Sequence, residues 1–372
     1  MTTETSIEGT DPDPADASIE EADRSAVNRE ALRRRIWWII VLILLLLVGA
    51  CGVAQLLFPR ARESARGAEA QAGLTPVFGV YGLHMPLGVA SMDDGSIVVA
   101  DTAVQRVSLF DERGRFVRRI GGDAVADKVF SVDGVMADGD TIYVCDWSLR
   151  RVWMFARDGK VKGFFPKNPM SSEFGASGLT PYDVVRVGSD VLVSSRNGIY
   201  RFDAATGKSK GRFDKTSPDG IEPLFVNGLT YDPDSKRVFA CDTLNRRVIA
   251  YDERGRALWR LGQRDEKGKI ISLFGLPRGA VMTSRGLLVS DAFNHVLYLL
   301  DADGNLKGVY GSRGVLDGQF NFPEGLDVAP DGLLYVADRE NNRVGVLRMG
   351  SPVAATSTVK RKWERNYERI VK

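Results

Sequence analysis

Five aspartates, each following a short apolar run, recur along the chain at a nearly constant spacing. They are Asp101, Asp146, Asp242, Asp291 and Asp338, and Ser195 takes the equivalent position in one further copy. Neighbouring members of this series are 45, 49, 47, 49 and 47 residues apart. Repeated carboxylates suggest metal binding, but a short hairpin of its own follows each of these residues. We therefore predict that each carboxylate ties its hairpin, by accepting backbone N–H groups or by pairing with the Arg five residues on.

Residue types that commonly carry catalysis are scarce. The two histidines are His84 and His295, and the sequence contains no HExxH, CxxC or GxSxG motif. Cys145 and Cys241 stand directly before a landmark aspartate in copies two apart, too distant for the roughly 6 Å that a disulfide needs. We interpret both as small buried core residues. The sequence thus favours a binding protein over an enzyme and indicates no cofactor.

The landmark residues belong to a repeat of short strands. In the last copy, a strand at 322–328 ends in a tight Pro-Asp-Gly turn, and a second strand at 332–338 ends in Asp338. A third strand then begins with Arg343 and Val344, and complete copies have room for a fourth. Repeats of this length built of short strands indicate propeller blades, because no single blade can bury its own faces. Six copies predict an all-β, six-bladed β-propeller.

The motif inside the repeat resembles that of NHL repeats. Its pattern is Pro-x-Gly-Leu/Val, a turn, hydrophobic-Val-Ala-Asp, and then Asn/Arg-Arg-Val, and the best match combines residues 323–326, 335–338 and 342–344. The copy at 181–202 has lost its Asp and Arg and is recognised by position alone. The resemblance implies an NHL-type propeller at 76–350. It does not imply one function, because NHL propellers serve many ends.

An enzymatic alternative comes with this resemblance. Propeller amidating lyases are similar but depend on several metal-binding histidines, which this chain lacks. Lactonase-like six-bladed enzymes hold a central Ca²⁺ with carboxylates and Asn. Residues of those types lie in the predicted first strands of the blades: Asp133, Asp183, Asn227, Glu324 and Asp327. A propeller hydrolase or lyase with a central divalent metal is therefore the alternative function.

The number of strands predicts how the ring closes. The last copy stops after its third strand, at 344–347, and an unassigned strand at 76–82 precedes the first copy. We expect this N-terminal strand to complete the sixth blade and cover two exposed edges. Alternating strand directions then place the tight Gly turns on one face. The Asp-to-Arg hairpins and the links between blades lie on the opposite, outward face.

The outward face is the predicted binding surface, because long loops on a rigid scaffold often carry binding residues. Its candidates combine aromatic, Arg and amide side chains, a mixture that suits a protein or peptide partner. They are Trp147, Arg150, Arg196, Asn245, Arg246, Phe293, His295, Arg339 and Asn341. Each has the alternative role of stabilising its own hairpin.

The sequence before the propeller predicts a membrane tether. Residues 1–35 are polar and acidic, as expected of a disordered cytoplasmic tail, and the segment 36–58 has no charge. As a helix, that segment would span about 35 Å, enough for a bilayer core of about 30 Å. Basic residues are more frequent before it than after it, so the positive-inside rule predicts a single-pass cell-membrane protein with an extracytoplasmic propeller on a linker at 59–75. Lipidation of Cys51 and cleavage of a signal peptide are alternatives to this signal anchor.

The C-terminal tail, 351–372, is basic and amphipathic. Trp363, Tyr367 and Ile370 recur at helical spacing within it. One interpretation is a helix that lies on a membrane surface. The other is a frayed or propeller-docked tail.

Net charge argues against a nucleic-acid partner. The chain carries +2, and residues 1–35 contribute 9 acids and 5 bases, so the remainder carries +6. This excess is spread over a large surface without a concentrated patch. The sequence therefore predicts a membrane-tethered extracytoplasmic propeller that acts as a protein- or ligand-binding adaptor or sensor.

Overall fold

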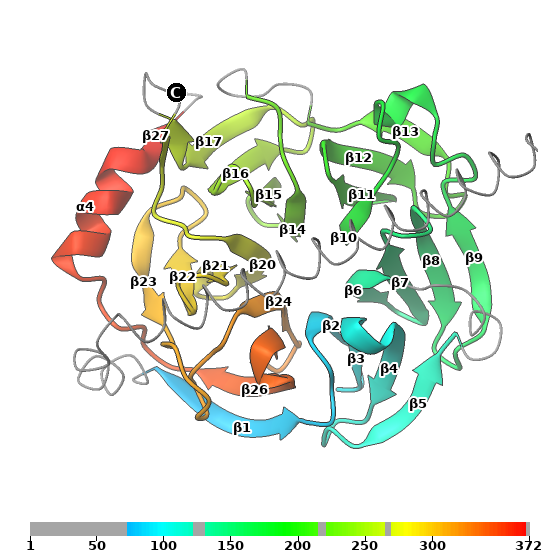
Figure 1. Cartoon of the computed structure of the whole chain (residues 1–372), viewed down its shortest axis with the longest axis horizontal. Helices are drawn as coiled ribbons and strands as arrows, with labels where there is room; N and C mark the ends of the chain where they lie inside the picture. The colour runs from blue at the N-terminus through cyan, green and yellow to red at the C-terminus, as the bar shows by residue number, and fades with distance from the viewer. Residues whose placement is uncertain (1–72, 122–130, 215–220, 265–268, 370–372) are drawn as a thin grey trace, which may run out of the picture. The chain divides into compact units, whose positions relative to one another are not determined.

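Six antiparallel sheets form blades around a central axis (Figure 1). The computed structural model describes residues 73–121, 131–214, 221–264 and 269–369. Five of the blades have four strands and one has five. The predicted all-β, six-bladed propeller is therefore confirmed.

Blades 1 to 5 follow one another along the chain. Blade 1 comprises β2 (Pro86–Ser91), β3 (Ile97–Asp101), β4 (Arg106–Phe110) and β5 (Phe116–Ile120). Blade 2 comprises β6 (Val132–Asp138), β7 (Thr141–Asp146), β8 (Arg151–Ala156) and β9 (Val161–Phe165). Blade 3 comprises β10 (Pro181–Val187), β11 (Asp190–Ser195), β12 (Gly198–Asp203) and β13 (Ser209–Arg212). Blade 4 begins with β14 (Val226–Asp232), β15 (Arg237–Asp242), β16 (Arg247–Asp252) and β17 (Ala257–Leu261). Blade 5 comprises β20 (Pro277–Thr283), β21 (Gly286–Asp291), β22 (Val296–Leu300) and β23 (Leu306–Tyr310).

Smaller elements occupy the connections. Short 3₁₀ turns lie at η2 (Thr102–Val104), η3 (Ser172–Phe174) and η4 (Arg339–Asn341). In the link from blade 4 to blade 5, β18 (Gln263–Arg264) pairs with β19 (Ile270–Ile271).

Blade 6 combines strands from both ends of the propeller sequence. It contains β24 (Pro323–Val328), β25 (Leu333–Asp338) and β26 (Arg343–Met349), with β1 (Leu74–Val80) as its outer strand. Strand β1 runs antiparallel to β26, from Leu74 opposite Met349 to Val80 opposite Val344. The outer position of the last blade is thus occupied by the first described strand of the chain.

The hydrophobic core lies between blades. Each of six apolar clusters joins side chains from two neighbouring blades, so every sheet is covered on both faces by its neighbours. Cys145 belongs to the cluster between blades 2 and 3, and Cys241 to the cluster between blades 4 and 5. Both are free, fully buried thiols. Packing between blades, rather than within one, therefore stabilises the fold.

Each landmark carboxylate binds the link that enters its own blade. Asp101 accepts the backbone N–H of His84 at 2.5 Å, and Asp242 accepts that of Leu224 at 2.8 Å. Asp338 accepts the backbone N–H of Asn321 at 2.7 Å. The same contact exists in blades 2 and 5, and the hydroxyl of Ser195 replaces the carboxylate in blade 3, where it accepts the N–H of Thr180. These residues therefore anchor a link as well as a hairpin.

The partner across the hairpin differs between blades. The Arg five residues on pairs with the carboxylate in blades 1, 4 and 6, at N–O distances of 2.7 to 2.9 Å. In blade 2, Asp146 instead accepts the indole N–H of Trp153 at 3.1 Å. The pair in blade 4 is buried on both sides, with 2% of the Arg247 side chain and 1% of the Asp242 side chain exposed. Loss of one partner of such a pair leaves an uncompensated buried charge.

A bulge in the first strand of each blade points one side chain at the central axis. The register against the second strand shifts after Pro86, Val132, Pro181, Val226, Pro277 and Pro323. In five blades the bulged segment of the first strand contains a Gly. A Cβ atom added to that Gly would come closer than 3.0 Å to the backbone of the first strand in the next blade. Glycine therefore permits the close packing of first strands around the axis.

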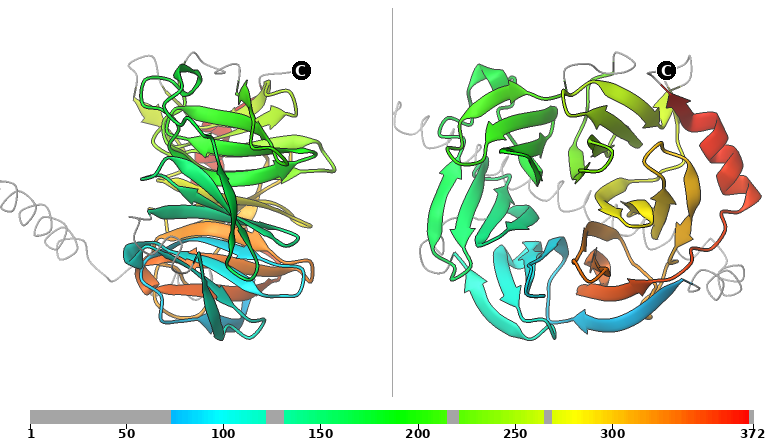
Figure 2. Two further views of the ribbon diagram at one scale, coloured as in Figure 1. Left: turned by 90° about the vertical axis from the view of Figure 1, so that its right-hand side faces the viewer. Right: turned by 180° about the vertical axis from the view of Figure 1, so that it is seen from behind.

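The C-terminal tail is docked on the rim of the propeller. Val353 forms a β-bridge with Val309 of β23, and α4 (Ser357–Asn366) then runs along the outside of blade 5 (Figures 1 and 2). Trp363 packs against the core between blades 4 and 5 and donates its indole N–H to the carbonyl of Gly304 at 2.8 Å. Strand β27 (Tyr367–Arg369) pairs with β17 as the fifth strand of blade 4.

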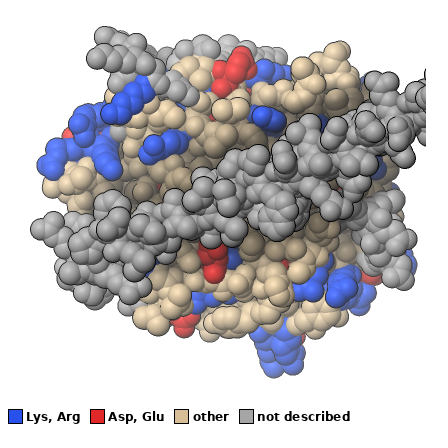
Figure 3. All heavy atoms as spheres, viewed as in Figure 1, with Lys and Arg blue, Asp and Glu red and all other residues tan. Residues whose placement is uncertain are grey.

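This structure shows the propeller-docked alternative for the tail. Binding of the tail to a membrane surface stays a prediction, and Trp363 would have to leave its blade to enter lipid. Ile370, the third apolar residue of the predicted stripe, lies outside the described residues. The exposed basic residues of α4 contribute to the cluster of Lys and Arg at the left of Figure 3.

Among the described residues, no helix is both long and apolar enough to span a membrane. The segment 36–58, for which the sequence predicts a transmembrane helix, lies outside the described residues, as do residues 1–35 and most of the linker.

Gly279→Ala is expected to lower the free energy of unfolding by about 1–3 kcal/mol, because the new Cβ would overlap the backbone of Glu324 and Gly325. Chemical denaturation followed by tryptophan fluorescence measures this difference. Gly345→Ala in β26 is the matched control, since its Cβ would meet only Leu347, at 4.0 Å. Equal losses in both variants would contradict the proposed role of close strand packing at the axis.

Candidate functional site

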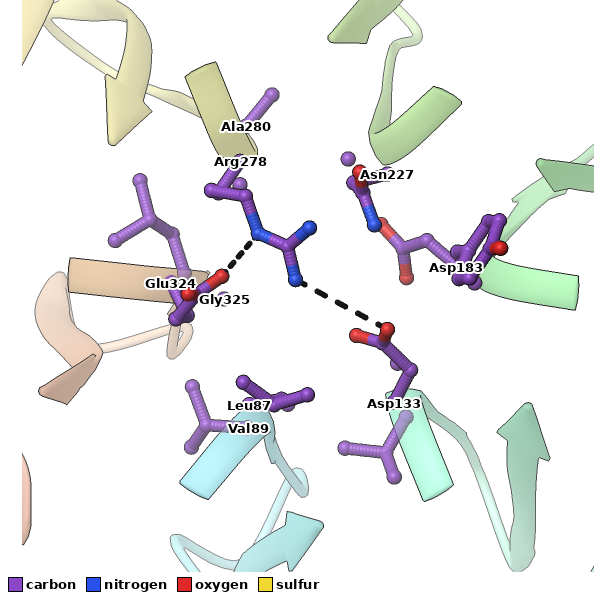
Figure 4. A pocket seen from close by; sticks show the side chains of 16 residues that line it. Leu87, Val89, Asp133, Asp183, Asn227, Arg278, Ala280, Glu324 and Gly325 are labelled. Carbon is purple, nitrogen blue, oxygen red and sulfur yellow. Dashed lines mark hydrogen bonds and ion pairs between the residues drawn. The ribbon is translucent and has the colours of Figure 1, made fainter. Parts of the chain in front are cut away.

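The bulged first strands enclose a polar channel on the propeller axis (Figure 4). The residue before the bulge Gly, or its equivalent in blade 3, lines this channel. These residues are Leu87, Asp133, Tyr182, Asn227, Arg278 and Glu324, and Asp183 occupies the Gly position of blade 3. The free volume for water is about 40 Å³, which corresponds to about three water molecules.

Arg278 crosses the channel and links two acidic side chains. Its Nε donates a short hydrogen bond to the Glu324 carboxylate, and its Nη2 lies 4.0 Å from Oδ2 of Asp133. Arg339 donates a second hydrogen bond to Glu324, at 3.4 Å. Only 2% of the Glu324 side chain is exposed. Two guanidinium groups therefore neutralise the most deeply buried carboxylate in the channel.

The other two channel carboxylates are less well compensated. Burial raises the pKa of Asp133 to about 6, although the positive charge of Arg278 opposes this rise. Burial also raises the pKa of Asp183 to about 7. Its carboxylate accepts the backbone N–H groups of Leu229 and Val184 at 2.8 and 2.9 Å, and these hydrogen bonds oppose the rise in pKa. Both groups therefore titrate close to neutral pH.

Asn227 points its amide into the channel beside Asp183 (Figure 4). The residue is 6% exposed, and neither its Nδ2 nor its Oδ1 has a hydrogen-bond partner among the described residues. A buried polar group without a partner costs about 1–3 kcal/mol. Such a group therefore calls for a physical explanation.

The channel residues do not fit a divalent metal ion. The guanidinium of Arg278 already lies between Glu324 and Asp133 and supplies the positive charge there. Asp327, another candidate ligand, instead accepts hydrogen bonds from the backbone and hydroxyl of Ser91, at 2.5 and 2.6 Å. The described part of the chain contains no group of three or more His, Cys, Asp or Glu that could hold a metal. In this arrangement the guanidinium of Arg278 occupies the position between Glu324 and Asp133.

The second candidate site is the face formed by the hairpins at 102–105, 147–150, 196–197, 243–246, 292–295 and 339–342 and by the links between blades. We call it the hairpin face. Trp147 and Phe293 are 44% and 57% exposed there. Arg196 is also exposed, with its guanidinium 5.1 Å from the ring centre of Phe225. These three predicted residues lie where a partner can reach them.

Three other predicted binding residues have structural contacts instead. Asn245 is buried and donates its amide to Asp242. His295 is buried, accepts the N–H of Phe322 at its Nδ1, and has its pKa lowered to about 4 by burial and by Arg313. Asn341 donates to Asp338 at 2.7 Å. The two amides tie their hairpins and the imidazole binds the link at Phe322, so these groups do not form a freely displayed binding surface.

The remaining predicted residues are partly buried arginines that support the links. Arg150 donates to the carbonyl of Ser177, and Arg246 donates to that of Phe274 at 2.9 Å. Arg339 reaches Glu324 in the channel. Arg278, the central residue of the channel, is not among the residues predicted from the sequence. The signal for it is its place between Pro277 and Gly279, because the middle residue of each Pro-x-Gly or equivalent segment faces the axis.

Comparisons with known proteins support the fold. The family model of the NHL repeat matches residues 320–347, in blade 6. No curated protein matches the chain. A streptogramin B lyase structure is 14% identical, with a TM-score of 0.52, over 76% of this chain and 99% of the other. A gluconolactonase from Xanthomonas campestris is 14% identical, with a TM-score of 0.54, over 77% and 93%. Kuenenia stuttgartiensis hydrazine synthase is 16% identical, with a TM-score of 0.51, over 77% and 86%. At these identities the likeness shows a shared propeller fold alone.

Asp133→Asn is expected to change how stability depends on pH. In the wild type, the pKa of Asp133 is about 6 when folded, against an ordinary value of 3.8. The unfolded chain therefore loses this proton first, and wild-type stability falls as the pH rises from about 4 to 6. The variant lacks this loss, so its free energy of unfolding relative to wild type should rise by roughly 2 kcal/mol across that window.

Denaturant unfolding at pH 4 and pH 7.5 measures this difference. Asp158→Asn is the control, because hydrogen bonds from Lys160 lower the pKa of Asp158. Both the folded and the unfolded chain ionise Asp158 by about pH 4, so the stability of this variant relative to wild type should change little between the two pH values. A rise of similar size in both variants would contradict the assigned burial of Asp133.

Proposed function

We propose that this protein is a membrane-tethered extracytoplasmic β-propeller that binds a protein or peptide partner through its hairpin face, as an adaptor or sensor. The rigid ring of blades holds the face in place, and the segment 36–58 tethers the ring to the cell membrane. The tether rests on the length and apolar character of that segment.

One observation carries the proposed binding role, namely the unequal distribution of exposed apolar side chains. In the described residues, ten of the fourteen large hydrophobic side chains that are exposed belong to the hairpin face. They are Tyr81, Met85, Val104, Trp147, Met170, Leu224, Leu244, Phe293, Val315 and Leu316. The other four lie on the outer strands β1, β5 and β9, and none lies in a described tight turn. Exposed apolar residues concentrated on one face are typical of an interaction surface.

Aromatic and Arg side chains on this face are already held in place. Phe293 packs edge-on against Phe322, with ring centres 5.8 Å apart, and the guanidinium of Arg339 lies 5.6 Å from the Phe322 ring centre. Between blades 3 and 4, the rings of Phe225 and Tyr182 have centres 5.3 Å apart at a tilt of 30°, and the guanidinium of Arg196 lies 5.1 Å from the Phe225 ring centre. Rigid aromatic and Arg anchors lose little entropy on binding and are common at the energetic centres of protein interfaces.

We further propose that β1 closes the ring as a structural seal. Its pairing with β26 covers an edge that the third strand of blade 6 would otherwise expose. The linker ends beside this strand, where Gly73 accepts the backbone N–H of Gly350 at 2.7 Å. The tether and the closing strand are therefore continuous in sequence.

A photo-crosslinking residue placed at Phe293 is expected to capture a discrete partner in intact cells, because that side chain is exposed on the hairpin face. The matched control is the same residue placed at Arg113, which lies in a tight turn with 73% of its side chain exposed. Immunoblots of the crosslinked protein measure both yields. Similar products from both positions would contradict binding by the hairpin face.

Asp140→Cys is expected to react with a membrane-impermeant maleimide in intact cells, because this tight-turn residue is exposed and the proposed topology places it outside. Gel-shift labelling measures the reaction. Wild type is the control, since its thiols at Cys145 and Cys241 are fully buried. Labelling of the variant only after lysis would overturn the extracytoplasmic topology.

A further inference from the structure

We infer that the axial channel binds a small neutral ligand with a hydrogen-bond donor and acceptor on adjacent atoms, as in a vicinal diol or a primary amide. The channel adjoins the hairpin face at Arg339, which bonds Glu324, but the inference does not depend on a partner on that face. It rests on which channel side chains have bonding capacity left.

Three side chains on different blades retain that capacity. Asn227 on β14 offers an amide N–H₂ donor and a carbonyl acceptor, neither of which is used within the described structure. Asp133 on β6 accepts no hydrogen bond from the described residues, and its nearest cation is Nη2 of Arg278, at 4.0 Å. Arg278 on β20 uses Nε for Glu324, so its terminal nitrogens face the channel (Figure 4). A complementary ligand must therefore both donate and accept hydrogen bonds.

The other two polar residues are already committed. Glu324 accepts hydrogen bonds from Arg278 and Arg339. Asp183 accepts two backbone N–H groups, one from its own strand and one from blade 4. They shape the charge of the channel without being its principal binding groups.

Charge in the channel favours a neutral ligand. A carboxylate would approach Arg278 but would also face Asp133 and Asp183. An ammonium group would approach those carboxylates but would face the buried guanidinium of Arg278, which is 17% exposed. Moving a charge out of water into such a mixed site is costly unless it is paired. A neutral donor–acceptor pair meets each of these groups without that cost.

The size of the channel limits the ligand. Its free volume of about 40 Å³ holds about three water molecules, so the bound group has only a few non-hydrogen atoms. Binding energy per atom has a ceiling, and a group this small therefore binds weakly. Ethylene glycol and acetamide at millimolar concentration are suitable probes for the diol and the amide.

Saturation-transfer NMR on the full-length protein in detergent micelles tests the inference. Ethylene glycol or acetamide is expected to receive saturation from the wild type, and the Asn227→Leu variant should reduce that signal at least fivefold. The Trp147→Ala variant, changed on the hairpin face alone, should leave it unchanged. Acetate and methylammonium serve as charged probes and should give little signal. The neutral probe with the stronger signal identifies the ligand chemistry.

Thermal unfolding separates a lost site from a lost fold. Asn227→Leu should unfold at or above the wild-type temperature, because it replaces an unpartnered buried amide with an apolar side chain. Asn227→Ala, which adds no bulk, should also lose the probe signal. Equal signals in wild type and both variants would overturn the inference. Signals from the charged probes alone would also overturn it. If no probe gives a signal and Asn227→Leu is less stable than wild type, the amide binds only water, and the inference is likewise overturned.

Discussion

The hydrogen bond from each inter-blade link to the landmark residue of the blade it enters is the contact on which the propeller depends. It fixes where a blade begins relative to the preceding one, and blade 3 preserves it with the Ser195 hydroxyl after losing the carboxylate. Most of the landmark carboxylates also hold the hairpin between the second and third strands of the blade. One buried side chain per blade thus determines both the spacing of blades and the position of the surface loops.

The same constraint creates the polar channel. Blades that are held at a fixed spacing bring their first strands together at the axis, where Gly residues such as Gly279 allow close backbone contact. The bulge beside each Gly then directs one side chain inward. With Asp133, Asn227, Arg278 and Glu324 at these positions, the channel concentrates ionisable and amide groups that a close-packed apolar core would exclude.

The repeat pattern was sufficient to predict the blades, the landmark residues and the buried cysteines, because each depends on local alternation and on a fixed period. Burial of Asn245 and His295 could not be predicted, because it depends on links whose paths are not periodic. Arg278 could not be predicted because a charged residue in a strand ordinarily indicates a solvent-exposed position. Here the bulge instead directs the Arg278 side chain toward the axis. Docking of Trp363 was left open because an apolar helical stripe fits a blade edge as well as a lipid surface.

The pairing of β1 with β26 has a mechanical consequence. In the proposed tethered protein, a force applied through the linker would reach the described propeller at Leu74 and would be borne first by the hydrogen bonds between these two strands. A pull along β1 loads those bonds together, in shear, whereas a pull away from the sheet would break them one after another. In the proposed tethered arrangement, the outer strand of blade 6 would be the force-bearing joint, and the direction of the load would determine its strength.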